Sequence, residues 1–221
     1  MLLKKAQRRN APSETKDYYD ETKLKAGDLS ASRKMTIGVA GAMPRIGTTT
    51  QALQIARYIF TRQKKVAYIQ AFESDFVDAL RLNYTDVTMD KYGNVLYNRI
   101  PLVKRDDIQT VAGDDFEYLV FDYGSYTNTG FDTVSFLERN TQILVGGSAP
   151  QELNYTTDAL SDKIFLNSKI LFNLVPEDDQ KAVERMMQGR EDDTFFSGYQ
   201  PDMFSYYGIM DRVYEQILPK I

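Results

Sequence analysis

Short apolar segments alternate with longer segments of helical periodicity through most of this chain, beginning near Met35. Short apolar runs are typical of buried strands, and apolar residues that recur every three or four positions are typical of helices. Strands separated by helices predict βαβ units and a parallel sheet. We therefore expect an α/β protein with three layers, in which helices cover both faces of a mostly parallel sheet.

The alternation assigns each element to a defined stretch of the chain. The expected strands cover 34–41, 64–72, 116–125, 141–150 and 168–176. The expected helices cover 48–63, 74–82, 105–113, 132–140, 151–162, 177–190 and 208–221. A hairpin or a loose excursion is expected in 85–100, where β-forming residues flank a turn-forming Lys-Tyr-Gly-Asn segment.

Polar or glycine-containing segments follow all five expected strands. They read GAMPRIGTTT, QAFES, FDYGS, GGSAPQ and FNLVPED. In parallel α/β sheets, ligands bind beyond the carboxyl ends of the strands, which share one edge. Five polar loops at that edge therefore predict a binding site there.

The first of these loops, residues 41–50, has the layout of a phosphate-binding loop, because an apolar strand precedes it and a helix follows it. Backbone N–H groups at such a helix start face the phosphate. The usual pattern places a lysine after the last glycine, and Thr48 holds that position here. The alternative is a tight turn that binds nothing, in which the three threonines only cap the helix.

The composition narrows the chemistry that this site can use. The chain of 221 residues contains no Cys and no His. That composition excludes disulfides, thiol catalysis, Cys/His zinc sites and Ser-His triads. Any reaction must therefore depend on Asp, Glu, Lys, Arg, Tyr or bound water.

Charge is distributed unevenly along the chain. Residues 1–34 hold nine Lys and Arg against five Asp and Glu, whereas the whole chain has a net charge of −4. We expect 1–34 to be a flexible basic tail and 35–221 to be the folded domain. A basic arm can bind an anionic partner, but a solvated leader is the simpler interpretation. Because no apolar run approaches 18 residues and no signal-peptide pattern is present, we expect a cytoplasmic protein.

These motifs resemble those of the MinD/ParA-type ATPases, a branch of the P-loop fold with an altered phosphate loop. That family's loop reads roughly Gly-Lys-Gly-Gly-Val-Gly-Lys-Thr-Thr and aligns with residues 42–50. The phosphate-binding lysine falls on Thr48. The second lysine, which reaches into the partner subunit of the family's ATP-bound dimer, falls on Met43. The matching positions are Ile46, Gly47, Thr49 and Thr50.

The resemblance implies a site for ATP or ADP with Mg²⁺. The residues implied to hold the nucleotide are Arg45, Ile46, Gly47, Thr48, Thr49, Thr50 and Asn173. Asn173 would read the adenine, Thr49 and Asp122 would hold Mg²⁺, and Asp122 would be the catalytic acid. Two acids of the family are replaced here, the first by Gln70 and the second by Phe72. The structural alternatives are that Asp122 opens a turn and that Asn173 closes a strand.

The replacements should reduce hydrolysis more than binding. A hydrogen bond to a charged group contributes roughly 1.5–3 kcal/mol. Stabilising the charge of the transferring phosphoryl group is the main catalytic device of this class, and both lysines that would do so are missing. Arg45 returns one positive charge, although its planar guanidinium places that charge differently from a lysine.

The resemblance therefore favours a degenerate MinD/ParA-like protein that binds a nucleotide, hydrolyses it weakly or not at all, and acts as a positioning or assembly scaffold. The bacterial pilus-localisation proteins of the CpaE/TadZ type are most similar in pattern. Protein partners, a homodimer, or pilus or secretion machinery are implied, with membrane contact indirect at most and nucleic acid least favoured. Two alternatives remain open: an active Mg²⁺-dependent ATPase that uses Arg45, and a DNA-partitioning relative that uses the basic tail.

Two features near the C-terminus carry separate expectations. The apolar face of 208–221 favours packing in the core over a membrane-surface helix, because its polar face is not basic. The aromatic segment 192–208 is either a loop held on the body by its rings or an interaction surface.

Overall fold

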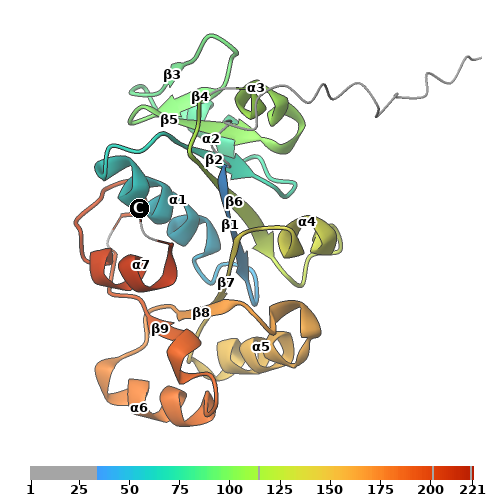
Figure 1. The fold of residues 1–221 in the computed structure, drawn as a ribbon, viewed down its shortest axis with the longest axis vertical. Coiled ribbons are helices and arrows are strands. Elements are labelled where there is room, and N and C mark those ends of the chain that lie inside the picture. The colour runs from blue at the N-terminus through green and yellow to red at the C-terminus, as the bar shows by residue number, and fades with distance from the viewer. Residues whose placement is uncertain (1–33, 114, 201, 220) are drawn as a thin grey trace, which may run out of the picture. The chain divides into compact units, whose positions relative to one another are not determined.

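The computed structural model describes residues 34–113, 115–200, 202–219 and 221 (Figure 1). The predicted basic tail, apart from Lys34, lies outside the described residues, so the division of the chain near residue 34 stays a prediction.

A sheet of nine strands forms the centre of the described domain. Its order is β3-β4-β5-β2-β6-β1-β7-β8-β9, with neighbours parallel from β5 to β9 and antiparallel pairs at the β3–β4–β5 edge. The strands are β1 Met35–Gly41, β2 Val66–Gln70, β3 Thr88–Met89, β4 Val95–Tyr97, β5 Ile100–Lys104, β6 Tyr118–Ser125, β7 Thr141–Gly146, β8 Lys169–Phe172 and β9 Thr194–Phe196.

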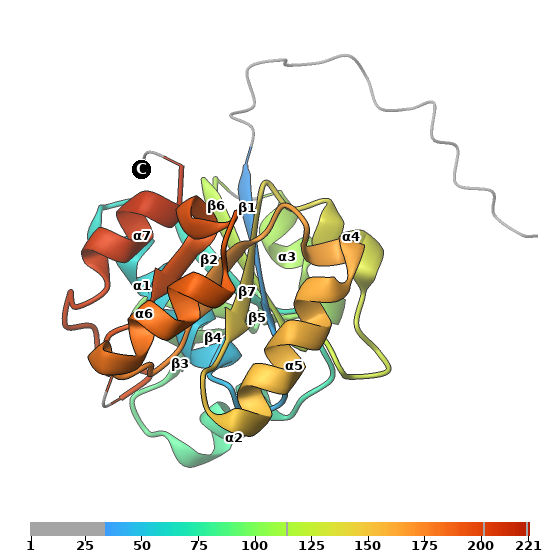
Figure 2. The ribbon, with the colours of Figure 1, turned by 90° about the horizontal axis from the view of Figure 1, so that it is seen from below.

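Helices cover both faces of this sheet. The α-helices are α1 Thr48–Thr61, α2 Phe76–Asn83, α3 Gln109–Ala112, α4 Thr133–Leu137, α5 Pro150–Ser161, α6 Glu177–Met186 and α7 Asp211–Ile217. Short 3-10 turns are η2 Arg105–Asp107, η3 Lys163–Phe165 and η4 Glu191–Asp193. Figures 1 and 2 show α1 and α7 on one face and α4 and α5 on the other. The predicted three-layer α/β fold is therefore confirmed.

The middle of the sheet positions the candidate site. Strand β1 lies between β6 and β7. Later parts of the chain therefore extend the sheet on both sides of β1. All eight residues of β6 are buried, as expected for a central strand that is covered on both faces. In the register of β1 and β6, Val39 pairs with Asp122 and Gly41 pairs with Ser125. The loop after β1 and the end of β6 therefore meet at one edge of the sheet.

Two strands were not predicted from the sequence. In β5, Pro101 interrupts an otherwise strand-like run, and a proline argues against a central strand. The structure places Pro101 opposite Leu96 of the antiparallel β4, and the parallel pairs with β2 begin one residue later at Leu102. Strand β9 has three residues and lies at the edge of the sheet, so its periodicity is too short to detect.

The C-terminal helix packs in the core, as predicted. Tyr214 and Ile217 of α7 are buried, and the rings of Tyr58 and Tyr214 meet edge to face at 5.3 Å. The aromatic segment before it is held on the body by Phe204, whose ring contacts those of Phe76, Tyr84 and Tyr97. Within the described part of the chain, no helix is long and apolar enough to span a bilayer.

Candidate functional site

The loop between β1 and α1 has an irregular backbone that leaves the start of the helix open. Arg45 has φ 65° and Gly47 has φ 98°, both in the left-handed region. Gly47 precedes the first residue of α1, and no side chain among the described residues caps this helix. The interpretation that the threonines act as caps is therefore wrong. The first N–H groups of a helix have no partner within it, so an uncapped start favours an anion.

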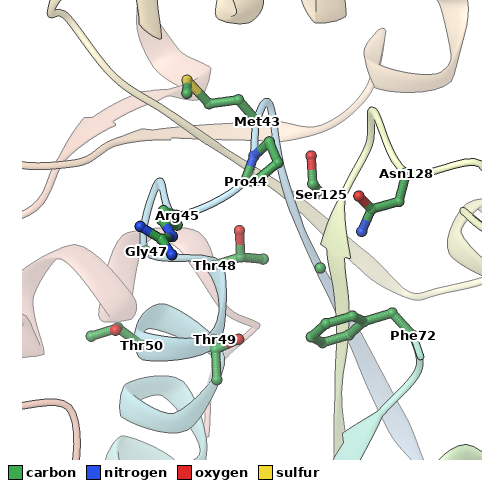
Figure 3. A pocket seen from close by; sticks show the side chains of 11 residues that line it. Met43, Pro44, Arg45, Gly47, Thr48, Thr49, Thr50, Phe72, Ser125 and Asn128 are labelled. Carbon is green, nitrogen blue, oxygen red and sulfur yellow. The ribbon is translucent and has the colours of Figure 1, made fainter. Parts of the chain in front are cut away.

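A pocket of about 320 Å³ lies against this helix start (Figure 3). Arg45, Thr48 and Thr49 lie on the loop side, and Phe72 and Asn128 lie across from them. The described residues that line it are Met43, Pro44, Arg45, Gly47, Thr48, Thr49, Thr50, Phe72, Gly124, Ser125 and Asn128. Arg45 is the single charged residue of this set, so the pocket offers one cation, the hydroxyls of three threonines and one serine, one asparagine amide and backbone amides.

Asp122 lies beneath the pocket and does not line it. Its side chain is fully buried and accepts hydrogen bonds from the Tyr68 hydroxyl at 2.7 Å and from the Gly124 N–H at 2.9 Å. The Thr49 hydroxyl lies close enough to lower the pKa of this carboxyl, so the structure brings together the two residues predicted to hold a metal. The pKa of Asp122 is raised above its ordinary value. Burial raises it and outweighs the opposing effects of Thr49, Gly124 and Tyr68, which lower it.

Tyr68 was not predicted from the sequence as a residue of this site, and neither were Ser125 and Asn128, which line the pocket. Burial, together with the nearby Asp122 carboxylate, raises the pKa of Tyr68 well above its ordinary value, so its hydroxyl stays protonated and donates. A tyrosine inside an otherwise apolar strand was the available signal, because a buried hydroxyl needs a partner. The identity of that partner depends on β2 pairing with β6, which the sequence does not reveal.

The two residues that replace acids of the MinD/ParA-type pattern have structural roles. Gln70 donates to the carbonyls of Phe72 at 3.3 Å and Ser74 at 2.8 Å, and it accepts from the Val77 N–H at 3.3 Å. It therefore holds the turn between β2 and α2. The Phe72 ring lies against Gly124, where an added Cβ would be 2.8 Å from the ring. This ring forms the wall of the pocket above the end of β6.

Asn173 follows β8 and braces the loop from below. Its Nδ2 donates to the Ile46 carbonyl at 2.9 Å, and its Oδ1 accepts from Gln51 at 3.1 Å and from Ser197 at 2.5 Å. The buried Tyr214 hydroxyl donates to the other end of the Gln51 amide at 2.8 Å. Three hydrogen bonds already engage the Asn173 amide, so its use as a reader of adenine stays a prediction.

A second pocket, of about 600 Å³, adjoins the first and shares Arg45, Gly47 and Thr50 with it. It lies between the loop and the starts of α5 and α6. The remaining lining residues are Ile46, Gln51, Ser148, Ala149, Pro150, Glu152, Asn173, Leu174, Pro176, Asp179 and Gln200. A volume of this size is typical of small-molecule sites. The predicted nucleotide residues therefore lie on the walls of two adjoining pockets, and Asp122 lies outside both.

The P-loop pattern implies Mg²⁺ at this site. Magnesium in phosphate sites is anchored by one or two carboxylates together with phosphate oxygens and waters. The described residues around the first pocket include no Asp or Glu. Across the described residues, no group of three or more His, Cys, Asp and Glu is placed to hold a metal ion. These residues do not fit Mg²⁺.

No family model matches the chain, and no curated protein matches it. Solved structures are similar in fold. The MinD cell division protein of Aquifex aeolicus has a TM-score of 0.53 at 15% identity, covering 76% of this chain and 83% of that one. A plasmid partition protein of Borrelia burgdorferi has a TM-score of 0.55 at 11% identity, covering 84% and 100%.

The signal recognition particle receptor FtsY of Elizabethkingia anophelis, in complex with GDP, is also similar. Its TM-score is 0.52 at 13% identity, covering 85% of this chain and 64% of that one. At such identities the similarity establishes the fold alone. It is the P-loop NTPase-like fold that the sequence predicted.

Proposed function

We propose that this chain binds a nucleotide through residues 41–50, hydrolyses it weakly or not at all, and acts as a positioning or assembly scaffold. The observation that carries the proposal is the pair of adjoining pockets that share Arg45, Gly47 and Thr50. One pocket has the uncapped helix start and the cation that suit a phosphate. The other has the volume and mixed lining that suit a nucleoside.

Two of the similar structures support the nucleotide-binding and positioning parts of this proposal. FtsY is described in complex with GDP, and the MinD protein acts in cell division. In doubly wound sheets the ligand lies at the carboxyl ends of the strands, where both pockets of this chain lie. The scaffold role, a homodimer, and partners in pilus or secretion machinery of the CpaE/TadZ type extend the proposal and rest on the sequence pattern.

Weak hydrolysis follows from the residues around the phosphate pocket. Thr48 and Met43 stand where lysines would place charge, and Phe72 is apolar. Enzymes that transfer a phosphoryl group depend on fixed positive charge near it. Among the described residues that line this pocket, Arg45 alone supplies such charge.

An active ATPase is the second candidate, and one observation favours it. The Thr49 hydroxyl lies close enough to Asp122 to lower the pKa of its carboxyl, and these are the two residues that the sequence pattern implies for a metal. Phosphate release by the full chain distinguishes the two functions. The scaffold proposal predicts release at background with ATP and Mg²⁺. Release above background that disappears in Asp122→Ala would favour the ATPase.

Calorimetric titration of ADP into the full chain tests binding at the loop. Arg45→Ala should weaken ADP binding by about tenfold or more, because it removes the cation of the pocket. Arg99→Ala is the matched control, since Arg99 is also exposed and also has a positive φ, of 67°, on a different loop. Equal affinity of the two variants would place the ligand elsewhere.

A further inference from the structure

The carboxylate at the end of β6 is enclosed by protein donors. A carboxylate has about four acceptor positions on its two oxygens. On Asp122, the Gly124 N–H occupies Oδ1 and the Tyr68 hydroxyl occupies Oδ2. Because this side chain is fully buried, it has no surface to offer to a hydrated cation.

Among the residues that the structure describes, none that lines the phosphate pocket is anionic. The side-chain oxygens of its described residues are neutral: they are the hydroxyls of Thr48, Thr49, Thr50 and Ser125 and the amide of Asn128. Phe72 takes the wall above Gly124, where a carboxylate would reach the pocket. Neutral hydroxyls alone hold Mg²⁺ poorly, because this ion gives up its waters reluctantly and selects carboxylates and phosphates.

The charge of the pocket limits how much negative charge its ligand can carry. A phosphate monoester carries about −1.5 to −2 charges at pH 7. Arg45 is the single cation among the described residues of the phosphate pocket, and Glu152 and Asp179 line the adjoining one. A triphosphate would bring additional negative charge without a metal or a lysine to balance it.

We propose that this site binds the phosphate of its nucleotide without a divalent cation, and that it takes nucleoside mono- or diphosphates in preference to a magnesium–triphosphate complex. The inference rests on the proposed function, because it concerns the same loop. In this proposal Tyr68 engages the β6 acid through its hydroxyl, and Phe72 takes the place on the pocket wall where a carboxylate could reach the ligand.

Calorimetry of the full chain with ADP and with ATP, each in excess MgCl₂ and in excess EDTA, tests the inference. The dissociation constant for ADP should agree within about twofold between the two buffers, and ATP should bind no more tightly than ADP. An increase in affinity of about tenfold or more with Mg²⁺ would overturn the inference while leaving the proposed function intact. Absence of binding in every condition would overturn the proposed function as well.

Two substitutions of Phe72 test whether the missing carboxylate is the cause of binding without a divalent cation. Phe72→Asp places a carboxylate on the pocket wall and should make ADP binding stronger in Mg²⁺ than in EDTA, by about fivefold or more. Phe72→Asn is the matched control, with the same shape and no charge, and should show no such difference. Equal responses of the two variants would overturn the assignment of the missing carboxylate as the cause. The comparison of buffers on the unmodified chain requires no variant to fold.

Discussion

The Nδ2 atom of Asn173 donates a 2.9 Å hydrogen bond to the carbonyl of Ile46, and this contact joins the end of β8 to the loop between β1 and α1. The same amide accepts hydrogen bonds from Gln51 and Ser197. Tyr214 of α7 extends the network through Gln51. The conformation of the loop is therefore fixed by residues that lie far apart in the sequence.

Asn173→Ala should destabilise the domain by about 1–3 kcal/mol, because it removes the partners of the Ile46 carbonyl and of the Gln51 Nε2. Urea denaturation followed by circular dichroism measures the free energy of unfolding. Asn167→Ala, at an exposed asparagine before β8, is the control and should be neutral within about 0.5 kcal/mol. Equal stability of the two variants would show that the network contributes nothing.

Gly47→Ala should disrupt the loop more directly. Gly47 has φ 98°, and a Cβ there would lie 2.3 Å from Nδ2 of Asn173. We expect a loss of about 1–3 kcal/mol of stability and a loss of ADP binding. Gly113→Ala is the control, since nothing lies within 4 Å of an added Cβ there. In the double variant Gly47→Ala/Asn173→Ala the clash disappears. The double variant should therefore lose less stability than the sum of the losses of the two single variants.

Thr48→Lys should strengthen ADP binding by about tenfold, because an ammonium in the pocket gains at least about 1.5 kcal/mol from a phosphate. Thr48→Met, of similar length but uncharged, controls for the added bulk. Phosphate release from ATP should stay at background in both variants, because Asp122 remains enclosed. Hydrolysis restored by Thr48→Lys alone would contradict this account of the acid.

Tyr126→Phe should remove a pH-dependent contribution to stability. The Tyr126 hydroxyl donates to Asp162, and this bond, with that from the Ile164 N–H, lowers the pKa of the Asp162 carboxyl. A lowered pKa stabilises the fold above the unfolded value of about 3.9 and ceases to do so as the pH falls through the folded value. The stability gap between the chain and Tyr126→Phe should be constant from about pH 7 to 5 and narrow below about pH 4. Tyr155→Phe, at a partly exposed tyrosine, should show no such trend.

The sequence predicted the parts of the fold whose signals are local. The apolar runs of β1, β2, β6, β7 and β8 and the periodic faces of the helices each lie within one stretch of chain. Strand β5 was obscured by Pro101, whose position opposite the antiparallel β4 is visible only in the sheet. Strand β9 depends on its parallel pairing with β8 and carries no pattern of its own.

In the candidate site, too, features with a local sequence signal were predicted and features that depend on long-range contacts were not. Residues of the loop, such as Arg45 and Gly47, were predicted because a phosphate loop is contiguous in sequence. The hydrogen bond from Tyr68 to Asp122 spans 54 residues, and that from Asn173 to Ile46 spans 127. Such contacts require knowledge of strand order and register, so the enclosure of the acid and the bracing of the loop emerged only from the structure.

The central claim is that a nucleotide phosphate binds at the start of α1. Titration of ¹⁵N-labelled full chain with ADP, followed by amide chemical shifts, tests it most directly. The account predicts saturable shifts at the amides of Gly47, Thr48, Thr49 and Thr50, and weaker saturation in Arg45→Ala. Unchanged signals from these amides at saturating ADP, or shifts confined to another part of the chain, would contradict it.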